Sequence, residues 1–190
     1  MVTESRFKLF VIIITTLASF MTAFMGSSIN IALPSIGKEF NLGPVFLSWL
    51  ATIFLITTAV LLLPAGKLSD IYGRAKFMKI GIIIFSLGSL SCGFSNSGIL
   101  LLIFRLFQGI GSSLMFATAT AILVSVFPVK ERGKVIGINL TSVYVGLSSG
   151  PFLGGLISHY LGWRFIFFIN FLLGIITIIF IFSANPLPDE

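Results

Sequence analysis

Long uncharged, mostly apolar runs alternate with short charged segments along the whole chain. The six runs are Leu9–Gly37, Phe40–Gly66, Ile80–Phe104, Leu106–Val129, Val135–Trp163 and Phe165–Pro188. Each is longer than the roughly 20 residues that a helix needs to cross the hydrocarbon core of a membrane. The turn-forming stretch Phe94–Gly98 and the helix-ending Pro128 refine the limits. We expect an all-α membrane protein with helices near 9–33, 45–65, 79–96, 99–127, 135–157 and 164–184.

The composition supports a membrane protein. Apolar residues make up 56% of the chain and charged residues only 9%, whereas a soluble domain carries about 25% charged residues. The net charge of +6 would suit nucleic acid, but the basic residues fall in short segments between apolar runs, so we expect membrane lipid as a partner and no nucleic acid. The first run is longer than the apolar part of a signal peptide, so it is interpreted as a retained helix.

The distribution of Lys and Arg predicts the orientation. Nine of them fall on one side of the predicted helices, in the N-terminal tail and in the segments that join helices 2 to 3 and 4 to 5: Arg6, Lys8, Lys67, Arg74, Lys76, Lys79, Lys130, Arg132 and Lys134. Only Lys38 and Arg164 fall on the other side. The positive-inside rule therefore predicts cytoplasmic termini, with a tail at 1–8, a bundle at 9–184 and a tail or linker at 185–190. Trp49 and Trp163 are expected at the outer membrane interface.

An internal repeat accompanies the six predicted helices. A shift of 89 positions places Gly66 on Gly155 and Gly73 on Gly162. One segment follows the second helix and the other follows the fifth, so they are expected on opposite sides of the membrane. This predicts two inverted three-helix repeats, the construction of many secondary transporters.

The segment between the second and third helices contains Gly66, Asp70, Gly73, Arg74 and Lys76 in the pattern G-x-L-x-D-x-x-G-R-x-K. The pattern resembles the cytoplasmic loop motif of the major facilitator superfamily. Glycines allow a tight turn there, and the acid and the arginine, four positions apart, could pair or cap a neighbouring helix. The alternative is an ordinary basic loop that only sets topology.

The predicted fourth helix carries Arg105, Gln108, Gly109 and Ser112, which resemble the fourth-helix motif of the same superfamily. Arg105, Gln108 and Ser112 share one helical face. A guanidinium stays charged and is costly in lipid, so Arg105 is expected to face the bundle interior or a watery cavity, with a coupling role. The alternative is that its side chain reaches the outer interface. A stripe of small residues from Gly109 to Ala121 is expected to serve helix packing.

The predicted fifth helix resembles the motif of the antiporter branch of the superfamily, through Gly146, Gly150, Pro151, Gly154 and Gly155. Glycines four positions apart allow another helix to approach closely. The proline removes an amide donor and is expected to kink the helix. A generic packing face is the alternative interpretation.

The predicted first helix ends in Asn30–Pro34, and Trp163-Arg164 opens the sixth. The first of these is similar to the first-helix motif of the fourteen-helix drug:proton antiporter branch of the superfamily, and the Trp-Arg pair resembles the antiporter branch. That branch usually has an aspartate nine residues before the proline, where this chain has Met25. No acidic residue lies within a predicted helix, so the coupling ion stays open. Asn30 could contact a substrate in the cavity or join two helices.

The resemblance implies the N-terminal half of a secondary exporter, similar to multidrug efflux proteins and driven by an ion gradient through alternating access. It would need a second six-helix half, which could be another chain, a second copy or further sequence of the same polypeptide. The substrate would be a small molecule, and the 21 Phe residues suit a lipophilic one, although they suit lipid-facing surfaces equally. The alternative is a truncated or regulatory module without transport activity.

Enzymatic and metal chemistry find no support in the sequence. One cysteine, Cys92, and one histidine, His159, cannot form a metal cluster. The predicted helices contain no nucleophile with its base and no group of acids. We therefore expect a multi-pass protein of the cell membrane with no cofactor, no metal and no enzymatic activity.

Overall fold

The structure is a computed structural model that describes residues 4–183 of the chain. Six α-helices account for nearly all of this range, and it contains no strand. They are α1 (Glu4–Phe40), α2 (Pro44–Tyr72), α3 (Arg74–Gly93), α4 (Gly98–Val126), α5 (Val129–Tyr160) and α6 (Arg164–Ser183). All six are long and apolar enough to cross a membrane. The prediction of an all-α fold with six membrane-spanning helices is confirmed.

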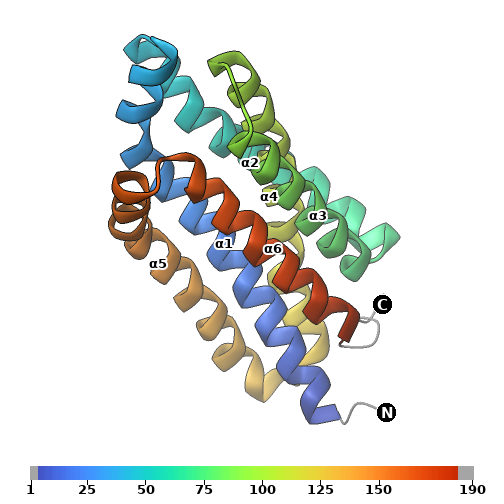
Figure 1. Ribbon diagram of the computed structural model, residues 1–190. Coiled ribbons are helices and arrows are strands. Elements are labelled where there is room, and N and C mark those ends of the chain that lie inside the picture. The colour runs from blue at the N-terminus through green and yellow to red at the C-terminus, as the bar shows by residue number, and fades with distance from the viewer. Residues whose placement is uncertain (1–3, 184–190) are drawn as a thin grey trace.

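The helices run side by side in one bundle, and the start of α1 lies at the same end as the end of α6 (Figure 1). An even number of crossings requires this arrangement. The central helix is α1, which packs mainly against α5 and also contacts α4 and α6. The largest side chains of the core include Phe85, Phe167, Met21 and Met25, all fully buried.

The packing follows the repeat that the sequence predicts. The first helix of each three-helix unit packs against the second helix of the other unit, so that α1 lies on α5 and α4 lies on α2. The two junctions that the 89-residue shift relates also share a conformation. Gly73 between α2 and α3 has φ +104°, and Gly162 between α5 and α6 has φ +97°. L-residues with a side chain rarely adopt this region, which explains a glycine at both junctions.

Several helices are longer than predicted, because apolarity marks only the part that crosses lipid. The expected loop between α2 and α3 is reduced to Gly73, so Asp70 lies on the last turn of α2 and Arg74 opens α3. Likewise α5 begins at Val129, and its first two turns carry Lys130, Arg132 and Lys134. Charged residues are compatible with a helix that extends into water, and residues 129–134 include no proline or other residue that would interrupt the backbone hydrogen bonds of the helix.

The prediction that α1 ends at Pro34 is wrong, since the helix continues to Phe40. A proline removes only one helical hydrogen bond. Burial of Ala32 and Ile36 on either side of it holds this stretch of α1 against the bundle, which offsets the lost bond. The helix therefore extends to Lys38 and Glu39, which the sequence analysis placed in a loop.

Trp163 also differs from its prediction. The residue was expected at the membrane interface, but only 3% of its surface is exposed. It packs edge-on against Phe40 and Phe167. Trp49 is half exposed near the start of α2, as expected of an interfacial residue.

Candidate functional site

A buried polar network surrounds Arg105 on α4. Its Nε donates to the Leu50 carbonyl of α2 at 3.2 Å, and its Nη1 donates to Oε1 of Gln108 at 2.8 Å. The Gln108 amide in turn donates to the Ser89 hydroxyl of α3 at 2.7 Å. The guanidinium carbon lies 4.5 Å from the centroid of the Phe54 ring, within the range of a cation–π contact. The network thus joins α2, α3 and α4.

The arginine is completely buried, so its side chain does not reach the outer interface. This confirms that the face of Arg105 and Gln108 points into the bundle. Within residues 4–183 the Nη2 group of Arg105 has no hydrogen-bond partner, and neither has the buried hydroxyl of Ser112. Buried polar groups are nearly always paired with protein or water. The Ser28 hydroxyl on α1 and Oδ1 of Asn170 on α6 are likewise buried without a partner in the described residues, so Arg105 is the one charged group among four such sites.

Close packing of α4 against α2 explains Gly109. A methyl group at this position would lie 2.8 Å from Cβ of Thr57 and 2.9 Å from the Phe54 carbonyl oxygen. No side chain fits there, and the Thr58 hydroxyl of α2 donates to the Gly109 carbonyl at 3.3 Å. The expected packing role of the small-residue stripe is therefore observed at Gly109.

Of the two roles considered for Asp70 and Arg74 at the α2–α3 junction, pairing is present. Nε and Nη2 of Arg74 each lie 2.7 Å from Oδ1 of Asp70. Nη1 of the same arginine donates to the carbonyl of Ala121 near the end of α4 at 3.3 Å. The pair therefore also ties the junction to a third helix. Gly66 and Lys76 take no part in these contacts: a methyl group at Gly66 would meet nothing within 4 Å, and Lys76 is exposed.

The glycine face of α5 packs against α1. A methyl group at Gly146 would lie 2.8 Å from the Phe20 carbonyl oxygen, and one at Gly154 would lie 2.8 Å from Cβ of Ser28. A methyl group at Gly150 would overlap the Ser27 hydroxyl. The predicted close approach of a second helix is thus observed, and α1 is that helix. Gly155 lies beside this contact, and Pro151 is exposed within the continuous helix.

Two further positions of α1 have contrasting environments. Asn30 is exposed and makes one long hydrogen bond, from Nδ2 to the Ser27 carbonyl at 3.4 Å. It does not join α1 to another helix. Met25, which stands at the usual aspartate position, is fully buried in the core. A different polar residue joins α1 to α5: Asn139 donates to the Thr15 carbonyl at 3.1 Å.

The sequence analysis missed an ion-pair cluster that joins the end of α1, the α3–α4 loop and the start of α6. Nη1 and Nη2 of Arg164 donate to the two carboxylate oxygens of Glu39 at 2.8 and 2.7 Å. The Trp163 indole donates to the same carboxylate at 2.8 Å, and Nη2 also donates to the Ser95 carbonyl at 3.1 Å. The sequence contained a signal for this cluster. Glu39 follows the first predicted helix and Trp163-Arg164 opens the sixth, so both lie on the side of the membrane that has few charges.

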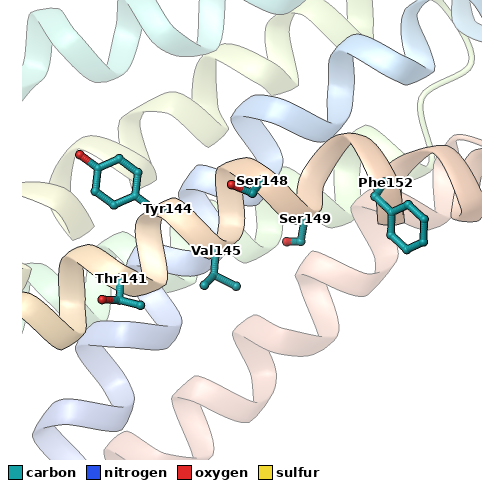
Figure 2. A pocket seen from close by; sticks show the side chains of 6 residues that line it. All are labelled: Thr141, Tyr144, Val145, Ser148, Ser149 and Phe152. Carbon is teal, nitrogen blue, oxygen red and sulfur yellow. The ribbon is translucent and has the colours of Figure 1, made fainter.

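A shallow hollow of about 580 Å³ lies on the outward face of α5. Six residues line it, all from this helix: Thr141, Tyr144, Val145, Ser148, Ser149 and Phe152 (Figure 2). None of them is charged, and three of them carry aliphatic hydroxyls. This hydroxyl–aromatic face is on the opposite side of α5 from the glycines that contact α1.

An all-helical, membrane-spanning bundle with inverted repeats and a buried arginine defines a class of membrane transport protein. The sequence profile described as Major Facilitator Superfamily matches residues 15–190. The chain belongs to this superfamily, whose members are transporters and not enzymes, and it is a multi-pass integral membrane protein.

Characterised relatives agree with this assignment. The riboflavin transporter RibZ of Clostridioides difficile is 37% identical over 185 residues, which cover 96% of this chain and 41% of RibZ. The multidrug resistance protein Stp of Mycobacterium tuberculosis is 35% identical over 92% of this chain and 33% of its own length. The multidrug transporter protein MdtP of Bacillus subtilis is 38% identical over 87% of this chain and 30% of its own. The chain therefore spans less than half the length of these relatives.

The fold also matches a solved transporter. A bacterial homologue of the human lysosomal transporter Spinster, in an inward-facing and unoccupied conformation, superimposes with a TM-score of 0.77. The match covers 98% of this chain and 44% of that one, at 24% sequence identity. At this identity the likeness shows the fold alone.

Proposed function

We propose that this chain forms one six-helix half of a secondary active exporter and works with a second six-helix half by alternating access. The observation that carries the proposal is the fully buried Arg105, whose Nη2 group has no hydrogen-bond partner among residues 4–183. Ionisable residues inside membranes are costly and mark substrate or ion pathways. The match of this chain to less than half of each full-length transporter supports the need for a second half.

The proposed cargo is a small organic molecule, since relatives at 35–38% identity are a riboflavin transporter and two multidrug transporters. An ion gradient would drive export from a cell membrane, with both termini in the cytoplasm. The proposed ion pathway differs from that of drug:proton antiporters with an aspartate in the first helix, because Met25 occupies that position and is buried in the core. Arg105 and Gln108 are the proposed coupling residues.

The remaining motif residues are proposed to act in the movement of the two halves. The Asp70–Arg74 pair would lie at the seam with the second half and fasten α2, α3 and α4 together there. Helices α1 and α5, which are in close contact at Gly146, Gly150 and Gly154, would move as one rigid unit. Asn30, which is exposed on α1, would face the cavity between the halves.

The test is efflux of a fluorescent substrate from energised membrane vesicles. Three preparations are compared: this chain alone, the candidate second half alone, and both together. Efflux that needs both halves and stops when an ionophore collapses the ion gradient is the expected result. Arg105→Lys then tests whether efflux needs only the positive charge or also the geometry of the guanidinium. Lysine keeps the charge but cannot form the two directed bonds to Leu50 and Gln108.

Two outcomes would contradict the proposal. Efflux that persists after every ion gradient is collapsed would exclude secondary active transport. Correctly inserted protein that transports nothing from a panel of neutral, anionic and cationic dyes, with or without a second half, would favour the alternative of a module without transport activity.

A further inference from the structure

Arginine is the first residue of both α3 and α6, the helices that complete the two three-helix repeats. Arg74 opens α3 directly after Gly73, and Arg164 opens α6 two positions after Gly162. Both glycines have a positive φ, at +104° and +97°, so each arginine follows the same kind of turn. Three helices separate the two turns along the chain, which places the turns, and with them the arginines, at opposite ends of the bundle.

The two arginines also make the same two kinds of contact. Each forms an ion pair with an acid near the end of a helix and donates a hydrogen bond to a backbone carbonyl near the end of a different helix. The partners of Arg74 are Asp70 and the Ala121 carbonyl, and those of Arg164 are Glu39 and the Ser95 carbonyl. Asp70 is four positions from its arginine, whereas Glu39 is 125 positions away. The Glu39–Arg164 clasp, as we name this second ion pair, therefore joins helices that are remote in sequence.

The clasp fastens residues 37–40, the last turn of α1, and this turn has little helical stability of its own. Ile36 is the last fully buried residue of α1, and Gly37, which follows it, has a low helix propensity. Pro34 removes a backbone hydrogen bond from the preceding turn. Asn41, directly after the helix, has a left-handed φ of +53°, which is uncommon outside glycine. The turn therefore needs contacts with other helices to stay helical.

The start of α6 supplies most of these contacts. The Glu39 carboxylate accepts two hydrogen bonds from Arg164 and one from the Trp163 indole, all at 2.7–2.8 Å. The Phe40 ring meets the Trp163 ring edge-on, with 5.9 Å between the centroids. Three hydrogen bonds between this turn and α6 thus depend on one carboxylate.

The clasp is accessible to solvent, so it can open without unfolding of the bundle. The Arg164 and Glu39 side chains are 33% and 41% exposed, and ion pairs of this kind contribute little free energy because water screens them. The start of the turn is held separately, since Gly37 packs closely against Leu47 of α2. The segment that depends on the clasp is therefore short, and it can separate from α6 as a local opening.

We propose that the Glu39–Arg164 clasp controls a local opening of α1. While the clasp is closed, residues 37–40 are helical and fastened to α6. When it opens, this turn unwinds while the six-helix bundle stays folded. The inference goes beyond the proposed transport function, because it concerns a conformational change within this chain alone. In the proposed transport cycle the clasp would set how readily this end of the bundle opens.

The test is hydrogen–deuterium exchange, measured by mass spectrometry, on the full chain in lipid nanodiscs. Short labelling times are used, at which amides in the core of the bundle do not exchange. We expect Glu39→Ala to speed exchange in a peptide that covers residues 37–42 about tenfold, because it removes the acceptor of three hydrogen bonds. Glu39→Gln keeps an amide oxygen that can accept from Trp163, so we expect an increase of about fivefold.

Two controls separate the clasp from general effects of substitution. Lys38→Ala shortens an exposed side chain on the same turn, and the structure describes no ion pair or hydrogen bond for that side chain. Asp70→Ala removes the acid of the ion pair at the opposite end of the bundle. Each control is expected to change exchange at residues 37–42 by less than twofold.

Faster exchange at residues 37–42 in both Glu39 variants, with the controls and the core amides unchanged, supports the local opening. Unchanged exchange there in Glu39→Ala, or an equal increase in Lys38→Ala, overturns it. An increase across all six helices at the same labelling times also overturns it, because the clasp would then support the whole fold rather than one turn. None of these outcomes depends on efflux, so this inference and the transport proposal succeed or fail separately.

Discussion

Glu39 at the end of α1 and Arg164 at the start of α6 form a two-pronged ion pair although 125 positions separate them in the sequence. The same carboxylate accepts a hydrogen bond from Trp163, and the arginine donates to the Ser95 carbonyl in the loop between α3 and α4. The guanidinium carbon also lies 4.3 Å from the centroid of the Trp163 ring. One exposed end of the bundle is therefore held by a single cluster that links the end of α1, the start of α6 and the loop between α3 and α4.

Loss of this ion pair should lower stability modestly. Both side chains are about one third or more exposed, at 33% for Arg164 and 41% for Glu39, so solvent screens the pair. We expect Glu39→Gln to lower the free energy of unfolding by about 1 kcal/mol. The measurement is thermal unfolding of purified protein in detergent. Glu131→Gln is the control, because the structure describes no side-chain contact for that exposed acid.

A double-mutant cycle shows whether the ion pair itself is responsible. Glu39→Gln and Arg164→Gln together should cost less than the sum of the two single changes, because either change alone removes the same pair. Strict additivity of the two effects would contradict the ion pair.

Replacement of Arg105 should damage both folding and transport. Arg105→Ala leaves the Gln108 amide oxygen and the Leu50 carbonyl without this donor in the bundle interior, at about 1–3 kcal/mol for each buried group. We expect a lower yield of monodisperse protein after detergent extraction and no detectable efflux. Gln108→Ala should reduce yield less, because Arg105 keeps its bond to Leu50. An Arg105→Ala protein that transports at the parent rate would exclude the coupling role.

Gly150→Ala should loosen the contact between α1 and α5. The added methyl group would overlap the Ser27 hydroxyl, and overpacking of this kind costs about 1–3 kcal/mol. The control on the same helix is Gly137→Ala, where an added methyl group meets nothing within 4 Å. That change should be neutral or stabilise the helix by about 0.5–1 kcal/mol. Thermal unfolding of the two variants side by side tests the difference, and equal midpoints would contradict the close packing.

The two junction glycines should respond alike to substitution. Gly162 has open space around it, so Gly162→Ala tests only the backbone strain at φ +97°, about 1–2 kcal/mol. Gly73→Ala should cost a similar amount, because its φ is +104°. Gly66→Ala, with open space and an ordinary helical conformation, serves as the control in the same unfolding assay. A large effect at one junction and none at the other would argue against their equivalence in the repeat.

The predicted orientation can be tested with thiol labelling of intact cells. Cys92 is the only cysteine and is fully buried, so the parent protein should give little background. In Cys92→Ser protein, a membrane-impermeant maleimide is expected to label Lys38→Cys and to leave Lys76→Cys unlabelled until the cells are broken. Both lysines are exposed at opposite ends of the helices. The reverse pattern would place the termini outside.

The sequence by itself determined the number of helices, the superfamily and the repeat, because each rests on local or periodic features. Uninterrupted apolar runs define membrane-crossing helices since lipid accepts few charges. The spacing of Asp70 and Arg74 across a glycine turn left two possibilities, a pair or the capping of a neighbouring helix, and the structure shows the pair together with a bond from Arg74 to the Ala121 carbonyl. By contrast, glycines four positions apart on α5 were sufficient to predict that another helix would approach closely.

Only the tertiary structure decided which helices meet and which polar groups pair. The sequence does not encode locally that α1 is the helix that contacts the α5 glycines, or that Arg105 reaches Leu50 and Ser89 through Gln108. The burial of Trp163 and its bond to Glu39 depend on three helix ends that lie far apart in the chain. Such contacts depend on the packing of the whole bundle, whereas hydropathy and spacing report only what each segment requires of its immediate surroundings.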